Sequence, residues 1–121
     1  MGEPISNGII GALANFTQGG SGPEHRKLTQ VFVSCGCSDA DPFDEITRTP
    51  NKVERIIVVG RAALRRPNAG MKFTEGLIDQ FRISNVFGSE RQFYENSIKI
   101  LTNELKHVGW SLTSDGRLQL P

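Results

Sequence analysis

The apolar residues of the first half of the chain recur mostly with the spacing of an α-helix. Ser6 is a suitable cap for a first helix, which the glycine-rich segment 19–23 ends as a loop. A second helix is predicted from Glu24, and Gly36 offers it a C-terminal stop. The apolar residues with helical spacing are Ile9, Ile10, Leu13, Ala14 and Phe16 in the first predicted helix, and Leu28, Val31, Phe32 and Cys35 in the second.

The clearest helical pattern follows a polar stretch in the middle of the chain. Residues 38–50 are rich in Asp, Pro and Thr and indicate an irregular connector. Thr49 and Pro50 then provide a cap followed by proline at the first helical position, so a long helix is expected to begin there. Its predicted inward face consists of Val53, Ile56, Ile57, Gly60 and Leu64.

Two further helices and a hairpin complete the predicted fold. A fourth helix should end before Asn85, and a fifth should run from about Ser89 to Gly109 with one apolar stripe. In the last eleven residues apolar and polar positions alternate around the turn sequence 114–116, which favours a β-hairpin. The fold class is therefore mainly α, a bundle of about five helices with a small C-terminal β-hairpin.

Composition supports one folded domain over residues 1–121, which stands alone or forms the N-terminal part of a longer protein. The 121 residues are 37% hydrophobic and 22% charged with a net charge of +1, values that exclude disorder and a bulk polyelectrolyte binder. No apolar run approaches the length of a membrane span, and the N-terminus lacks a signal-peptide pattern. We therefore expect a cytoplasmic protein with no membrane partner.

The sequence shows no assembled catalytic or metal site, so we expect neither enzymatic activity nor a cofactor. His25 and His107 have no motif around them and are interpreted as structural. Cys35 and Cys37 are too close for an ordinary disulfide and too few for a zinc site, which indicates reduced thiols. The acidic segment 39–45 lacks the glycine and the distal glutamate of a calcium loop.

Charge is distributed unevenly along the chain. Residues 1–45 contain two basic and six acidic residues, whereas residues 46–121 contain twelve basic and seven acidic ones. The basic side chains gather in the third predicted helix, and this group is the candidate binding surface for an acidic protein or for nucleic acid. Its members are Lys52, Arg55, Arg61, Arg65 and Arg66. A hairpin after a helix also fits a winged-helix regulator that binds DNA or RNA.

Three stretches of the chain resemble a known bacterial domain. The order of residues 6–10, the glycine-rich segment leading to His25, and residues 49–55 looks like that of the N-terminal domain of abortive-infection proteins of the AbiJ type. The closing segment, with residues 101–105, Gly109-Trp110-Ser111-Leu112 and Asp115-Gly116, is also similar to that domain. The resemblance covers almost the whole chain.

The resemblance implies a non-catalytic part of an anti-phage defence protein. In that family the domain precedes a HEPN ribonuclease domain and acts as a sensor or regulator. The Arg-x-x-x-x-His motif of the nuclease is absent here, since Arg61 leads to Arg66 and neither histidine has an arginine five residues before it. The expected partner is thus another protein or a C-terminal effector domain, and the oligomeric state is left open.

Overall fold

A computed structural model describes residues 3–44, 46 and 50–120. Within these residues it contains five α-helices, two short 3₁₀ turns and a two-stranded antiparallel hairpin, which confirms the mainly helical fold class. The elements are α1 (Asn7–Asn15), η1 (Gln18–Gly20), α2 (His25–Ser34), η2 (Ser38–Ala40), α3 (Lys52–Arg65), α4 (Ala69–Ile83), α5 (Gln92–Lys106), β1 (Ser111–Leu112) and β2 (Leu118–Gln119).

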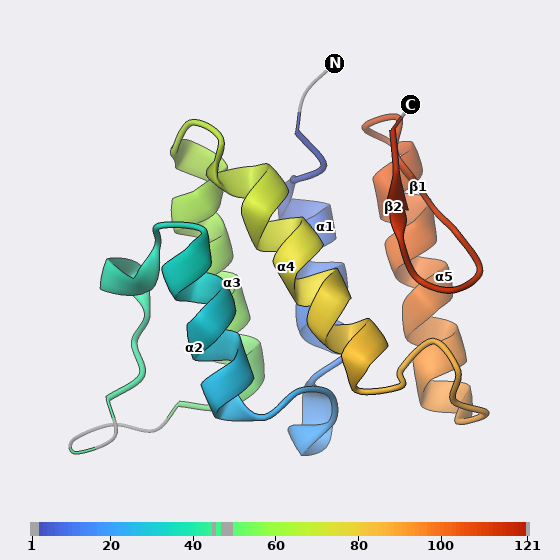
Figure 1. Ribbon diagram of the computed structural model, residues 1–121, viewed down its shortest axis with the longest axis horizontal. Coiled ribbons are helices and arrows are strands. Elements are labelled where there is room, and N and C mark those ends of the chain that lie inside the picture. Colours follow the sequence, from blue (N-terminus) through green and yellow to red (C-terminus); the bar gives the residue numbers. More distant parts are fainter. Residues whose placement is uncertain (1–2, 45, 47–49, 121) are drawn as a thin grey trace.

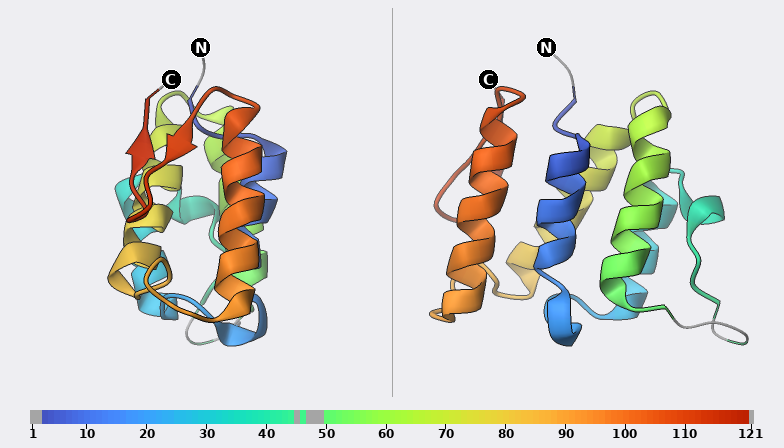
Figure 2. Two further views of the ribbon diagram at one scale, coloured as in Figure 1. Left: turned by 90° about the vertical axis from the view of Figure 1, so that its right-hand side faces the viewer. Right: turned by 180° about the vertical axis from the view of Figure 1, so that it is seen from behind.

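The helices form two layers around one hydrophobic core. Helix α1 lies between α3 and α5 in one layer, and α2, α4 and the hairpin form the other (Figures 1 and 2). Because α1 has neighbours on three sides, most of its residues are buried. Stacked phenylalanines join the layers, with Phe16 after α1 against Phe81 of α4 at 4.6 Å between ring centroids. None of the described helices is long and apolar enough to span a lipid bilayer.

The ends of the first two helices agree with the sequence prediction. The Oγ atom of Ser6 accepts a hydrogen bond from the backbone N–H of Ile9 at 3.1 Å, which caps α1. Gly36 has a φ of 76°, and the N–H of Cys37 after it donates to the carbonyl of Phe32. Such a left-handed residue ends the helix by satisfying one of its last carbonyl groups.

The predicted starts of α3 and α5 were wrong by a few residues. Helix α3 begins at Lys52 rather than Pro50, because the side chain of Asn51 accepts from the N–H of Glu54 at 2.8 Å and so caps the helix itself. Thr49 lies outside the described residues. Helix α5 begins at Gln92, since the Oγ atom of Ser89 accepts from the N–H of Arg91 in a turn before the helix.

The inward face of α3 also differs from the prediction by about one position around the helix. Val59, Ala62 and Ala63 are buried in place of Leu64, which is 39% exposed. Gly60 sets the position of the face, because a Cβ atom there would lie 2.8 Å from the Cγ2 atom of Ile10. Helices α1 and α3 therefore approach closely at this glycine.

Candidate interaction surface

The five basic residues expected on one surface lie in three different environments. Arg61 and Arg65 are exposed on α3, and Arg66 follows the last residue of the helix. Lys52 is partly buried at the first turn. Arg55 is completely buried, so its assignment to a binding surface was wrong.

The guanidinium of Arg55 is held in the interior by hydrogen bonds to three residues, Asp41, His25 and Thr29. Its Nε and Nη2 atoms donate to the two carboxylate oxygens of Asp41 at 3.1 and 2.6 Å. Nη1 donates to the carbonyl of His25 at 2.9 Å and approaches the imidazole Nδ1 at 3.0 Å, while Nη2 also donates to Thr29. The ring of Phe43 covers the guanidinium at 4.3 Å.

This cluster fixes the connector between α2 and α3 to the helices. Asp41 and Phe43 belong to the connector, and the carboxylate side chain of Asp41 is only 8% exposed. A buried charge is tolerated only when it is paired and hydrogen-bonded, and the guanidinium of Arg55 meets both conditions. Burial, together with the positive charge of Arg55, lowers the pKa of His25 below its usual 6.5. Because a guanidinium can only donate, Nδ1 of the imidazole is the acceptor in its contact with Arg55.

Arg66 and Lys52 are bound to other parts of the chain. Arg66 donates to both carboxylate oxygens of Asp39 at 2.7 and 2.8 Å, and this pairing holds the pKa of Asp39 below its ordinary value. The ammonium of Lys52 donates to the carbonyls of Gly20 and Ser21 at 2.9 and 3.4 Å. Burial lowers the pKa of Lys52 beside a hollow of about 530 Å³ at the start of α3.

Arg61 and Arg65 remain as the solvent-facing arginines of the predicted group. Within the described residues neither side chain has a hydrogen bond or an ion pair. They lie on a stripe of partly or fully exposed residues, which we call the outer face of α3. The outer face consists of Glu54, Ile57, Val58, Arg61, Leu64 and Arg65, within about 120° of arc on the helix.

A shallow groove runs beside the outer face where α3 meets α1. It has a volume of about 170 Å³ and is lined by Asn7, Ile10, Gly11, Ile57 and Arg61. Nothing lies within 4 Å of the position that a Cβ atom would take at Gly11, so the groove is open above this glycine. An apolar floor with an arginine at its rim is suited to a side chain or helix that is apolar with acidic neighbours.

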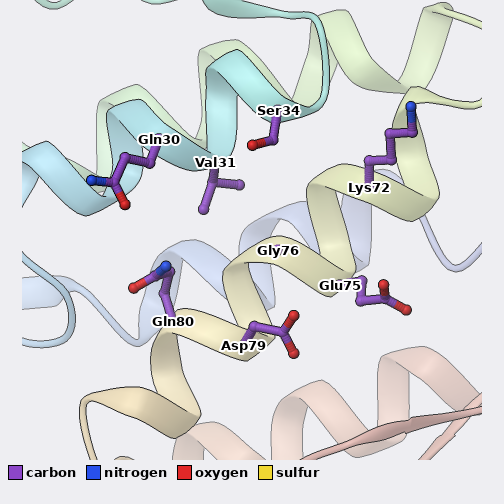
Figure 3. A pocket seen from close by; sticks show the side chains of 8 residues that line it. All are labelled: Gln30, Val31, Ser34, Lys72, Glu75, Gly76, Asp79 and Gln80. Carbon is purple, nitrogen blue, oxygen red and sulfur yellow. The ribbon is translucent and has the colours of Figure 1, made fainter.

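A second groove, between α2 and α4, has mixed charge. Its volume is about 360 Å³, and Figure 3 shows Lys72 toward one end and the amides of Gln30 and Gln80 toward the other. Its remaining lining residues are Val31, Ser34, Glu75, Gly76 and Asp79. Because Asp79 already accepts from Arg82 at 2.7 Å, the groove offers no concentrated charge of either sign.

The residues considered for catalysis or metal binding do not converge. His25 is engaged with Arg55, whereas His107 is exposed at the end of α5, 3.7 Å from the carboxylate of Glu104. Cys35 and Cys37 are buried free thiols, and burial with the neighbouring Cys37 raises the pKa of Cys35 to about 12. Among the described residues no three His, Cys, Asp or Glu side chains gather in a metal-binding cluster.

The hairpin and the exposed arginines do not form one surface. The hairpin packs on α5, and Arg82 of α4 donates to the carbonyl of Gly116 in its turn at 3.0 Å. Helix α3 lies on the far side of α1 from α5 (Figure 2). A winged-helix protein contacts phosphates with its wing and recognition helix together, and here α5 contains Glu95 and Glu104 beside its lysines.

Comparison of the chain with protein-family models, with curated protein sequences and with solved structures gives no match.

Proposed function

We propose that the chain is the non-catalytic recognition or regulatory domain of a bacterial abortive-infection protein, and that it contacts a protein partner through the outer face of α3. The observation that supports the surface is the contrast among its arginines. Arg55 and Arg66 are neutralised by Asp41 and Asp39, while Arg61 and Arg65 stay exposed one helical turn apart. The sequence resemblance supports the defence role.

The partner in this proposal is a separate protein or a C-terminal effector such as a HEPN ribonuclease domain, in the cytoplasm. Two arginines beside an apolar groove match an acidic protein surface, because the groove contributes apolar burial and the arginines contribute steering and orientation. Exposed arginines whose charge is not compensated raise the association rate with an acidic partner more than they raise the affinity of the complex.

The test is phage protection in a bacterium that expresses the full protein. Reversal of both charges, Arg61→Glu with Arg65→Glu, should abolish protection without lowering the melting temperature of the isolated chain. The matched control is Lys99→Glu with Lys106→Glu, the same change in charge on exposed positions of α5. Full protection by the Arg61/Arg65 variant would contradict the proposal.

Nucleic acid is the alternative partner class, and a binding titration separates it from protein. Labelled duplex DNA and RNA are titrated with the chain at low and moderate salt. Phosphate contacts release counterions, so binding to nucleic acid weakens as salt rises. Salt-dependent binding that is lost in the Arg61/Arg65 variant would therefore indicate nucleic acid, and not a protein, as the partner. Absence of binding at low salt is the result expected for a protein partner.

A further inference from the structure

The imidazole of His25 accepts a hydrogen bond at the same atom that it would use to gain a proton. Its Nδ1 atom lies 3.0 Å from Nη1 of Arg55. A guanidinium has donors and no acceptor, so Nδ1 takes this hydrogen bond and the proton of the neutral ring is on Nε2. Nδ1 is therefore the atom that a further proton must reach. The ring can become an imidazolium only if its hydrogen bond with Arg55 breaks.

The charges around His25 oppose its protonation in this position. Burial of the ring lowers the pKa of His25, and the positive charges of Arg55 and Lys52 on α3 lower it further. Asp41 of the connector acts in the opposite direction, but both of its oxygens already accept hydrogen bonds from Arg55. Arg55 is fully buried, whereas His25 is partly exposed. A ring that gains a proton therefore has to move away from Arg55.

A protonated imidazole has space to move beside the connector. A hollow of about 380 Å³ next to His25 is lined by Glu24, Arg26, Thr29 and Phe43. Its two charged members, Glu24 and Arg26, form an exposed ion pair at 3.1 Å and together add no net charge. Another hollow that His25 lines contains Lys52, whose ammonium repels a second cation. The imidazolium should therefore turn into the first hollow, where Phe43 lies.

Phe43 connects His25 to the backbone of the connector. Its ring stacks on the imidazole with 5.5 Å between the ring centroids. Its backbone N–H donates to Oδ1 of Asp41 at 3.0 Å, and the same oxygen accepts from Nε of Arg55 at 3.1 Å. An imidazole that turns away removes one packing surface of Phe43. The connector at residues 41–44 then loses this contact with α2.

We propose that protonation of His25 releases the connector at residues 41–44, while the helices stay folded. Neutral His25 holds this segment closed by accepting from Arg55 and stacking on Phe43. Charged His25 opens it, because two neighbouring cations and a blocked Nδ1 atom force the ring out of its place. The device does not depend on the partner of the outer face of α3, so it goes beyond the function proposed above.

The test is amide hydrogen exchange of the whole chain from pH 8 to pH 5, corrected for the intrinsic exchange rate. The amides that report opening are those of Ala40, Asp41 and Phe43, which donate to Cys37, Ser38 and Asp41. His25 has its ordinary pKa of about 6.5 in the open segment and a lower pKa in the closed one. The open fraction should therefore rise up to about tenfold per pH unit below 6.5. Amides of α4 should keep their protection, and the circular dichroism should not change.

Two histidine variants assign the effect to one residue. His25→Asn places an amide oxygen near the position of Nδ1, so it accepts from Arg55 without titrating. Exchange of its connector should be slow at every pH in the range. His107→Asn is the matched control, because it removes the other of the two histidines, which is exposed at the end of α5. The control should open with pH as the unaltered chain does.

Three results would overturn the proposal. The first is connector exchange that stays constant from pH 8 to pH 5 in the unaltered chain. The second is an equal rise in His25→Asn, and the third is a simultaneous loss of protection in α4, which would mean that the whole chain unfolds. If His25→Asn does not fold, an NMR titration of the His25 ring in the unaltered chain decides. Titration at or above pH 6.5 overturns the proposal, and titration below it, with connector exchange rising over the same range, supports it.

Discussion

Removal of the carboxylate that pairs with Arg55 should be among the most destabilising single changes in the chain. Asp41→Ala leaves a guanidinium that is fully buried without two of its hydrogen bonds, those of 3.1 and 2.6 Å. Breaking a buried ion pair by removing one partner costs about 3–5 kcal/mol. A domain of this size has a total stability of roughly 5–15 kcal/mol, so the loss is a large fraction of it.

The assay is urea denaturation followed by circular dichroism. With a urea dependence of about 1–3 kcal/mol per molar, the unfolding midpoint should fall by about 1 M or more. Asp39→Ala is the matched control, because Asp39 also forms a bidentate pair with an arginine but is 70% exposed. Water replaces the lost partner there, and the midpoint should change much less.

A double change separates the charge from the packing. In Arg55→Met with Asp41→Ala no buried charge is left unpaired, so the double variant should be less destabilised than Asp41→Ala alone. A loss below about 1 kcal/mol in Asp41→Ala would refute the reasoning, because the guanidinium would then have reached water or another acceptor.

Three further predictions concern glycines, a histidine and the cysteines. Gly60→Ala should destabilise by about 1–3 kcal/mol through overpacking against α1, whereas Gly11→Ala, with open space around it, should stabilise by about 0.5–1 kcal/mol in thermal unfolding. The pKa of His25 is lowered in the folded state, so as the pH falls the unfolded state protonates this imidazole first, and stability should fall as the pH drops below 6.5. His25→Asn should flatten the slope of stability against pH, and an unchanged slope would contradict the lowered pKa of His25. Cys35 and Cys37 should react with a thiol reagent at pH 8 only after denaturation, and rapid reaction of the native chain would contradict their burial.

Local patterns were sufficient for the helices and the hairpin because their periods are properties of short segments. The apolar spacing of α1 and α4 and the Asp115-Gly116 turn predicted elements that the structure contains. The starts of helices were less predictable, since several residues compete to cap them. Thr49 and Asn51 are both good caps in sequence, and the side chain of Asn51 accepts from a backbone N–H of the first turn of α3.

The candidate surface was only partly predictable. Arg61 and Arg65 were correctly expected to face solvent, because they lie opposite the buried positions of α3. Arg55 was misplaced, since a helical wheel treats a charged residue as outward-facing. No local signal marks its burial, because Asp41 comes from an irregular connector 14 residues earlier.

The sequence by itself determined which segments are helical, where glycine ends them and that basic residues concentrate in α3, because these depend on neighbouring residues. Only the tertiary structure decided which of those charges reach solvent. Burial of Arg55 requires Asp41, His25 and Thr29 to converge on one point, and pairing of Arg66 requires Asp39 from the connector. The distance between such groups is set by the packing of the layers, which no local pattern encodes.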